Sequence, residues 1–448
     1  MRFRGIVISV LVCLLALCLF GCEKEPVYPK EGSYFYKVED GSATIMDVDP
    51  EISGDVVIPD TLGGCPVIAI GEYAFEDCSY ITSVTIPDSV LSIEYCAFGY
   101  CTYLEDVHIG TGLTEMESGA FWGCESLQNV HIRDLAAWCQ VEGSGSGPLE
   151  EAENLYLNGE LLTDVVIPNG VTFIGGFAFS GYKKLASISI PDSVTTLESS
   201  AFSYCEGLME ITLPESITTI GDWAFEFCTG LTDITIPGGV TVLDGGVFQD
   251  CSNLESVTLP EGLTEIGMYA FHGCSSLKEI AIPNGVREIG MYAFYDCRSL
   301  TEIVLPDYLQ IIRMDTFEKC LQLNTIVLPE GLCVVEEYAF TDCKKLATVY
   351  HKGTAEDWNA IRFENGNDLI QNAAVQHNYD NGNPVPSDAP VGPADPNFVW
   401  PEGYDETTTI FDKIVVAIET LIGGIVFIIL APIIMIISTI ISLVTLFL

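Results

Sequence analysis

Cysteines are the residues in this 448-residue chain with the most obvious chemical potential, and ten of its 17 recur at one position of a 23-residue repeat. These ten are Cys78, Cys101, Cys124, Cys205, Cys228, Cys251, Cys274, Cys297, Cys320 and Cys343. Equivalent side chains on stacked strands lie ~4.8 Å apart, whereas the Cβ atoms of a disulfide lie nearer ~3.8 Å. The sequence also lacks a CxxC pair. The spacing therefore predicts a ladder of small buried apolar side chains, and neither a disulfide framework nor a metal cluster.

Two histidines form a second candidate site. His108 and His131 lie one repeat apart at the same position, beside Asp106. They could hold a metal between coils, but a structural site needs four ligands and no further outward His or Cys is expected nearby. We therefore expect no metal and no cofactor.

Motifs of catalysis are missing from the sequence. It contains no GxSxG, HExxH, P-loop or dinucleotide fingerprint. A hydrolase would need a pocket lined by convergent polar groups, which a regular repeat array is not expected to form. The sequence thus indicates a protein that is not an enzyme.

The repeat that positions these residues reads L-x-x-I-x-I-P-x-x-V-x-x-I-G-x-x-A-F-x-x-C in its better copies. Its phenylalanines are Phe75, Phe98, Phe121, Phe179, Phe202, Phe225, Phe248, Phe271, Phe294, Phe317 and Phe340, and Tyr182 replaces the cysteine in one copy. A fixed period of this length indicates a solenoid, because one coil is too small to bury its own core. I-x-I-P predicts a short strand that ends at proline, V-x-x-I-G a second short extended segment, and A-F-x-x-C a single helical turn. The expected fold class is a β-rich repeat solenoid of short strands and single-turn helices, with a C-terminal transmembrane helix.

The two ends of the chain predict export and anchoring. Residues 1–22 have a basic start, an apolar run and Leu19-Phe20-Gly21-Cys22, which resembles a bacterial lipobox with lipidation at Cys22; the alternative is an ordinary signal peptide with a chance cysteine. A short tether, 23–33, follows. Residues 379–410 form a proline-rich linker. The 414–448 segment ends in 28 uncharged residues, which as a helix would reach ~42 Å and exceed the ~30 Å hydrocarbon core. A transmembrane segment is therefore predicted there.

Between these ends the repeat array has two caps and one interruption. Residues 34–60 predict a capping hairpin around Asp40-Gly41 and a first strand, and 61–132 and 166–348 are repeats. Residues 133–165 and 349–378 break the register with similar stretches that contain Trp138 and Trp358. We interpret each as a short helix whose tryptophan covers a core edge, one within the array and one at its C-terminal end.

Charge excludes one class of partner. Lys+Arg 18 against Asp+Glu 63 gives a net charge of −45. Such a surface repels nucleic acid and anionic lipid headgroups, so no nucleic-acid partner is expected.

Outward positions of the first strand in each coil form the candidate binding face. Its first column is small or acidic, and its second changes from Thr and His to apolar residues toward the C-terminal end. The candidate residues are Asp106, His108, Asn129, His131, Glu210, Asp233, Glu279, Glu302, Val304, Val327 and Tyr350. An acidic stripe beside a partly apolar patch favours protein binding; the alternative is an ordinary solvated β-face whose threonines suit strands.

The units I-T-I-P…V-x-x-I-G-x-x-A-F-x-x-C resemble the BspA-like type of leucine-rich repeat across about residues 34–378. The resemblance implies a right-handed solenoid on the extracellular face of a bacterial cell membrane. It also implies adhesion to a protein or glycan on host or neighbouring cells. Many members end in a wall-sorting signal, whereas this chain ends in a hydrophobic segment. The membrane would thus be reached through the N-terminal lipid and the C-terminal helix. The alternative function is an envelope scaffold or spacer tethered to the membrane at both ends.

Overall fold

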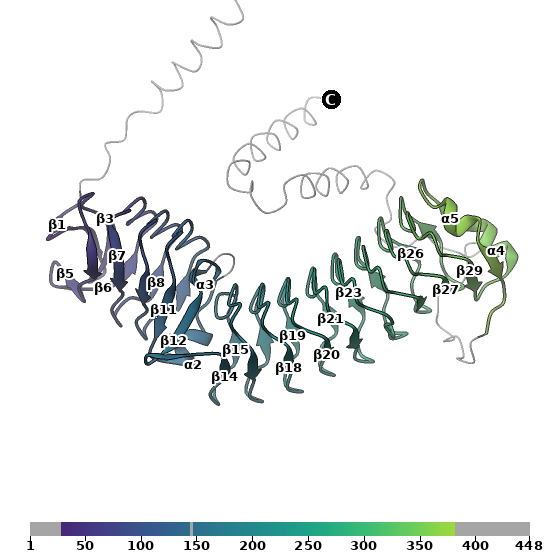
Figure 1. Ribbon diagram of the computed structural model, residues 1–448, viewed down its shortest axis with the longest axis horizontal. Helices are drawn as coiled ribbons and strands as arrows, with labels where there is room; N and C mark the ends of the chain where they lie inside the picture. The colour runs from purple at the N-terminus through teal and green to yellow at the C-terminus, as the bar shows by residue number, and fades with distance from the viewer. Residues whose placement is uncertain (1–27, 144–146, 381–448) are drawn as a thin grey trace, which may run out of the picture. The chain divides into compact units, whose positions relative to one another are not determined.

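Two columns of short parallel strands run through the protein, one pair of strands to a coil (Figure 1). The computed structural model describes residues 28–143 and 147–380. All of them belong to the first of two units, Met1–Ala394; the second unit is Asp395–Leu448. The predicted signal segment 1–22 and transmembrane segment 414–448 lie outside the described residues, as does most of the 379–410 linker. No helix within the described part of the chain is long and apolar enough to cross a membrane.

The first column is built from the I-x-I segments. Its strands are β4 (Gly54–Val57), β7 (Ile81–Thr85), β9 (Asp106–His108), β11 (Asn129–Ile132), β12 (Asn154–Leu157), β14 (Asp164–Val166), β16 (Ser187–Ser189), β18 (Glu210–Thr212), β20 (Asp233–Thr235), β22 (Ser256–Thr258), β25 (Glu302–Val304), β27 (Thr325–Leu328), β29 (Thr348–His351) and β31 (Ala374–Gln376). Within the regular stretches each residue pairs with the residue 23 positions later, as Ser187 does with Glu210. The predicted strand at 279–281 is absent, and alanine at 281 replaces the β-favouring threonine of other coils.

The second column is built from the V-x-x-I segments, which form strands of two residues. These are β8 (Ser92–Ile93), β10 (Glu115–Met116), β15 (Phe173–Ile174), β17 (Thr196–Leu197), β19 (Thr219–Ile220), β21 (Val242–Leu243), β23 (Glu265–Ile266), β24 (Glu288–Ile289), β26 (Ile311–Ile312), β28 (Val334–Val335) and β30 (Arg362–Phe363). In most of these strands one residue is buried in the core and the other is more exposed, as Leu197 and Thr196 are in β17, whereas both residues of β26 and β28 are buried.

An antiparallel hairpin closes the N-terminal end of the core. It consists of β2 (Tyr34–Glu39) and β3 (Ser42–Val48), joined at Asp40-Gly41, where both residues have positive φ. Two residues in the left-handed region suit the tight turn of a two-residue hairpin. Three further strands complete this end: β1 (Lys30–Glu31), β5 (Thr61–Leu62) and β6 (Cys65–Ile70).

The repeat phenylalanines form ring stacks in the core, as the period predicts. Neighbouring rings such as Phe202 and Phe225 lie 5.5 Å apart and almost parallel, at 5°. Both side chains are fully buried. Each coil therefore buries its largest ring against those of its neighbours and not within itself.

The cysteine ladder is buried and unpaired as predicted, and it also makes hydrogen bonds. Within the described chain all cysteines are free thiols. Each repeat thiol after the first in a stack donates to the phenylalanine carbonyl of the preceding coil, as Cys228 Sγ does to Phe202 O at 3.1 Å. That carbonyl also accepts the backbone N–H of Cys205 in its own coil, which uses both of its lone pairs. Burial raises the pKa of Cys78 to about 12, so this thiol is neutral at pH 7 and unsuited to nucleophilic or metal chemistry.

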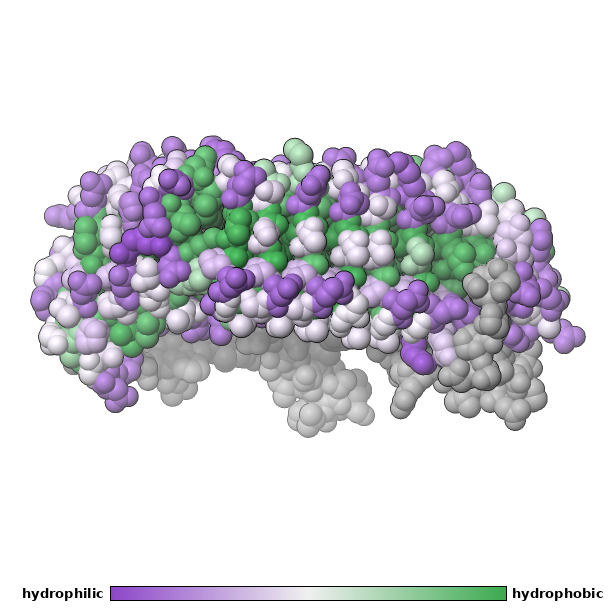
Figure 2. Space-filling view, turned by 90° about the horizontal axis from the view of Figure 1, so that it is seen from below, coloured by the Kyte–Doolittle hydropathy of each residue, from purple (hydrophilic) through white to green (hydrophobic). Residues whose placement is uncertain are grey.

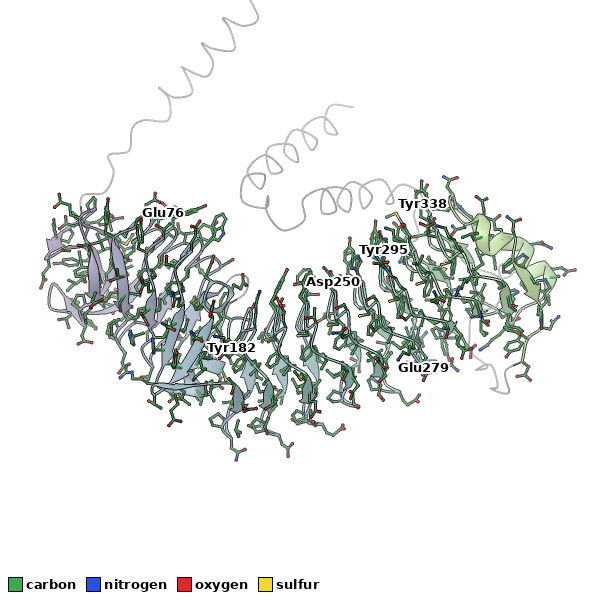
Figure 3. All side chains as sticks on the ribbon, viewed as in Figure 1. Glu76, Tyr182, Asp250, Glu279, Tyr295 and Tyr338 are labelled. Carbon is green, nitrogen blue, oxygen red and sulfur yellow. The ribbon has the colours of Figure 1, made fainter. Side chains whose placement is uncertain are left out.

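The A-F-x-x-C segment is not a helical turn, and the prediction of single-turn helices in the repeats is wrong. Around ten of the eleven phenylalanines the second residue before and the second residue after both have positive φ, as Trp223 (55°) and Phe227 (52°) do around Phe225; Phe177, before Phe179, is the exception. This conformation directs their N–H groups to carbonyls of the next coil, Gly245 and Gln249. The backbone thus combines bonds between coils with single turns within one coil, such as Glu226 N–H to Trp223 O, and does not form a continuous helix. We call the row of these turns the turn edge; in Figure 3 its residues Glu76, Asp250, Tyr295 and Tyr338 lie along one side of the array, opposite Glu279.

Helices within the described residues occur only in the irregular coil and the C-terminal end. They are α2 (Leu135–Cys139), α3 (Pro148–Glu151), α4 (Ala355–Ala360) and α5 (Asp368–Gln371). Both predicted tryptophan helices are present. Trp138 is buried and its indole N–H donates to Ala178 O at 2.8 Å, whereas Trp358 is partly buried against the core. Strand β13 (Glu160–Leu161) turns back along β12 in the irregular coil.

Candidate functional site

The outward side of the first strand column, which we call the strand face, displays most of the residues singled out from the sequence. Glu210, Asp233, Glu279 and Glu302 are exposed acidic side chains, although Glu279 is not in a strand. Figure 2 shows a band of hydrophobic residues between hydrophilic rows on the side of the array seen from below. The strand face therefore carries a row of exposed carboxylates at Glu210, Asp233, Glu279 and Glu302.

Rings stack on the strand face where the first repeat block meets the irregular coil. His108 and His131 lie 4.3 Å apart between ring centroids at an angle of 12°. Tyr156 continues the stack 4.9 Å beyond His131 at 13°. The three come from β9, β11 and β12, and parallel pairing of those strands aligns them. All three side chains are half-buried, so their ring edges reach solvent from a fixed position.

A row of polar groups runs beside the ring stack. The Asp106 carboxylate accepts from His131 Nε2 and from the Asn129 amide, both at 3.0 Å. The Asn154 amide then donates to Asn129 at 2.9 Å, and Lys184 Nζ donates to Asn154 at 2.7 Å. This row links four coils through directed hydrogen bonds, which fixes each amide orientation and leaves few side-chain rotamers to order on binding.

His108, the first histidine of the ring stack, is kept neutral mainly by its burial. Burial lowers the pKa of His108 below its ordinary value, the neighbouring His131 lowers it further, and Asp106 acts in the opposite direction. A neutral imidazole at pH 7 both donates and accepts hydrogen bonds. Among the described residues, no group of three His, Cys, Asp or Glu side chains is placed to hold a metal ion.

At the C-terminal end the predicted apolar patch is smaller than expected. Val304 is 42% exposed, but Val327, expected beside it on the surface, is only 5% exposed. The register does place Val327 beside Val304; burial by surrounding residues removes it from the surface. Tyr350 is half-buried and its ring lies 4.3 Å from that of Tyr379.

Several strand-face residues were missed from the sequence. Tyr156 and Asn154 lie in the irregular coil, where the 23-residue period fails. The pattern Leu155-Tyr-Leu followed by Asn158-Gly159 is nevertheless a strand followed by a turn, and aligning it with I-x-I would have placed the tyrosine next to His131. Val166, 72% exposed, pairs in the same way with Ser189.

One hollow departs from the regular array. It has a volume of about 670 Å³ and is lined by Glu142, Gly143, Thr172, Phe173, Thr195, Thr196, Glu198 and Ser199. The expectation that a regular solenoid forms no polar-lined pocket is therefore wrong at the irregular coil. Its lining consists of carboxylates, hydroxyls, a glycine and a ring.

Comparison with known proteins identifies the repeat. The BspA type leucine rich repeat region matches in 6 copies over residues 66–137, 152–278 and 243–370, which together are more than half of the chain. The chain therefore belongs to the family of BspA-type leucine-rich repeat proteins. A search among curated proteins finds no match.

Two solved structures of bacterial leucine-rich repeat proteins are similar to this chain. A leucine rich cell surface protein from Faecalibacterium prausnitzii is 28% identical, and the match covers 76% of this chain and 99% of that one with a TM-score of 0.49. A leucine-rich repeat protein from Bacteroides ovatus is 26% identical over 75% of this chain and 99% of that one, with a TM-score of 0.44.

Proposed function

We propose that this protein is a non-enzymatic, membrane-anchored surface protein whose strand face binds a protein or glycan on host or neighbouring cells. The observation that carries the proposal is the stack of His108, His131 and Tyr156 with its row of hydrogen-bonded amides. Folding needs only the inward residues of these strands, yet the outward ones form a connected and oriented set. Preordered rings and amides lose little entropy when a partner binds, which is what a recognition surface requires.

Membership of a repeat family known for binding surfaces supports this class of function. Each coil adds one rung of outward side chains on a scaffold that needs no change of shape, so partners can be bound by residue variation alone. The family assignment does not name a ligand, and a fold by itself does not specify one.

Anchoring forms a second part of the proposal. Lipidation at Cys22 and a membrane segment at 414–448 would hold the repeats outside the cell, since two membrane attachments give stable anchoring where one acyl chain does not. Mass spectrometry of the mature N-terminus is expected to show a diacylglyceryl cysteine at 22. An unmodified residue at 22, or cleavage elsewhere, would remove the lipid anchor from the proposal.

The adhesion test uses the full-length protein displayed on a surrogate cell. The double variant His131→Ser and Tyr156→Thr removes two rings of the stack while keeping residues suited to strands. We expect its adhesion to a panel of immobilised extracellular-matrix proteins and glycans to fall at least tenfold below that of the unaltered protein. The matched control, Thr235→Ser and Thr258→Ser, alters the same column farther along and should adhere normally.

Two results would contradict the proposal. One is adhesion by the ring-deficient variant equal to that of the unaltered protein at equal surface display. The other is no adhesion by the unaltered protein to any member of the panel, which would favour the envelope scaffold instead.

A further inference from the structure

Aromatic residues on the turn edge occupy backbone positions that disfavour them. Tyr73, Trp223, Tyr269, Tyr292 and Tyr338 all lie two residues before a repeat phenylalanine, with φ between 55° and 60°. Bulky side chains are rare in this region because Cβ crowds the backbone, and glycine or asparagine fits it better. Two other coils do have glycine there. Folding alone therefore does not explain why rings are used.

Burial does not explain these rings either. Tyr73 is 45%, Trp223 43% and Tyr338 44% exposed, whereas Tyr269 and Tyr292 are half-buried. The core behind them is already filled by the phenylalanine stack. Rings that are disfavoured by the backbone and left in solvent are better explained by contact with a partner, since aromatic side chains are enriched at binding surfaces.

Four rings on adjacent coils form a compact grid. Tyr269 stacks on Tyr292 at 4.9 Å and His272 on Tyr295 at 4.9 Å, with interplanar angles of 12° and 3°. Across each coil, Tyr269 lies 5.6 Å from His272 and Tyr292 lies 5.7 Å from Tyr295. We call these four residues the ring grid. It fixes four π-systems within two coils.

Carboxylates surround the ring grid. Asp250 Oδ1 lies 3.9 Å from His272 Nδ1, and Asp296 occupies the same position two coils on, paired with Arg298 at 2.7 Å. Glu226 holds a neighbouring position one coil before Asp250 and accepts a hydrogen bond from Gln249. Rings flanked by carboxylates attract cations, because the ring face and the carboxylate are both negative.

The chain itself shows how an ammonium binds here. Lys319 Nζ lies 4.4 Å from the centroid of the Tyr295 ring and donates to its hydroxyl. It is the one Lys or Arg at the positions two and three before or one and two after a repeat phenylalanine, in the described coils from Phe75 to Phe340. The geometry of the turn edge thus already supports one cation–π contact at the border of the grid.

We propose that the turn edge, centred on the ring grid of Tyr269, His272, Tyr292 and Tyr295, binds an extended Lys/Arg-rich segment of a partner protein. This surface lies on the side of the coils opposite Glu279 of the strand face (Figure 3). Charge decides between a basic peptide and a neutral glycan as the occupant. With a net charge of −45 and carboxylates beside the rings, the edge is complementary to cations.

The test uses full-length protein in detergent micelles and a synthetic ten-residue peptide of alternating Arg and Gly. A control peptide replaces each arginine with citrulline, which keeps the shape of the side chain and removes its charge. Titration calorimetry should show that the arginine peptide binds, that the citrulline peptide binds at least tenfold more weakly, and that added salt weakens the arginine peptide. Equal binding of both peptides would overturn the proposal.

Variants then locate the surface. Tyr269→Asn with Tyr292→Asn removes two rings of the grid, leaves the charge unchanged, and installs a residue that tolerates positive φ. We expect at least a tenfold loss of arginine-peptide affinity with an unchanged circular dichroism spectrum. If this double variant does not fold, Trp223→Gly removes one exposed ring at a position that suits glycine, and a twofold to fivefold loss is expected.

The matched control is Glu210→Gln with Asp233→Asn, which removes two charges from the strand face. An equal loss of affinity in this control, or full affinity in the ring variants, would overturn the proposal. So would competition by a neutral oligosaccharide at the ring grid, which would make the edge a glycan site. The His131→Ser and Tyr156→Thr variant should bind the arginine peptide normally, so failure of adhesion and failure of peptide binding remain distinguishable.

Discussion

The strand face and the turn edge belong to the same coils but follow different rules. On the strand face, residue type and backbone agree: Thr235 and Thr258 are β-branched residues in extended strands. On the turn edge they conflict, because Trp223 and Tyr292 occupy a left-handed conformation. Natural sequences tend to satisfy local preferences everywhere except where function intervenes. The comparison teaches that the conflicting positions are the more informative ones.

Both surfaces depend on one core, and removing a core ring should affect them together. Phe225→Ala deletes a fully buried ring between Phe202 and Phe248. The expected loss is ~3–5 kcal/mol. Because coils contact only their neighbours, hydrogen exchange read by mass spectrometry should show lost protection in the adjoining coils first. A loss below ~1 kcal/mol, or one confined to a single surface, would break the idea of a shared core.

Acid should loosen the C-terminal end, next to Tyr350 of the strand face. The next residue, His351, is fully buried, and burial together with His377 lowers its pKa from 6.5 to about 4. Between these values the unfolded chain binds more protons than the folded one, so stability falls as the pH falls from 6.5 to 4. The expected loss is roughly 3 kcal/mol.

Urea denaturation of the C-terminal end at pH 7, 5.5 and 4 measures this effect. The variant His351→Phe should have a stability that depends less on pH. His108→Asn on the partly exposed ring stack provides the comparison, with a much smaller change expected. A pH dependence that is the same with and without the imidazole at 351 would assign acid sensitivity to other groups.

Glycine substitutions should have different effects on the two surfaces. Thr235→Gly loosens a strand and should destabilise by ~1 kcal/mol. Trp223→Gly replaces a ring at positive φ with the residue that fits it, so the change should lie within ~0.5 kcal/mol of zero or be stabilising. Thermal denaturation of the two variants under identical conditions provides the measurement. Equal destabilisation would show that the ring at 223 contributes to folding and would weaken the contrast between the surfaces.

The smallest expected effect is a pH dependence of cation binding at the turn edge. Burial raises the pKa of Glu226 to about 7. A bound cation favours the carboxylate, so affinity for the arginine peptide should rise a few-fold from pH 6 to pH 8. Glu226→Gln should remove part of this rise. Burial also raises the pKa of Asp315 to about 7, so Asp315 should account for part of the remainder.

The groups that face Glu226 are Glu150, Ser203, Tyr204, Gln249 and Asp250. Affinity that falls over this range would contradict the assignment.

Much of the fold could be predicted because the repeat period determines which residues are neighbours in the structure. Residues 23 positions apart are neighbours, so the Phe202–Phe225 stack and the buried cysteines follow from the period alone. The turn conformation could not be predicted in the same way, because the period identifies recurring residues and not their backbone angles. Positive φ at Trp223 gave no signal, since aromatic residues are not typical of that region.

The candidate surface was predicted less completely than the core. Outward positions such as Asp106 and His131 follow from the I-x-I pattern, which is why the histidine stack could be anticipated. Tyr156 escaped because the period fails in the irregular coil. Val327 was placed in the correct column, but the inward-outward alternation of the strand does not predict that it is only 5% exposed.

The doubly used phenylalanine carbonyl has a consequence for how such arrays change length. Each coil presents its successor with the same acceptor for a thiol, so the joint between any two regular coils is interchangeable. A deletion or duplication of one complete 23-residue unit within Phe202 to Phe340 should restore all of these bonds, whereas a change of any other length would leave acceptors and thiols out of step. Each whole unit inserted between the histidine stack and the ring grid would increase the distance between these two surfaces by one coil. The number of coils would thus set the spacing between two bound ligands.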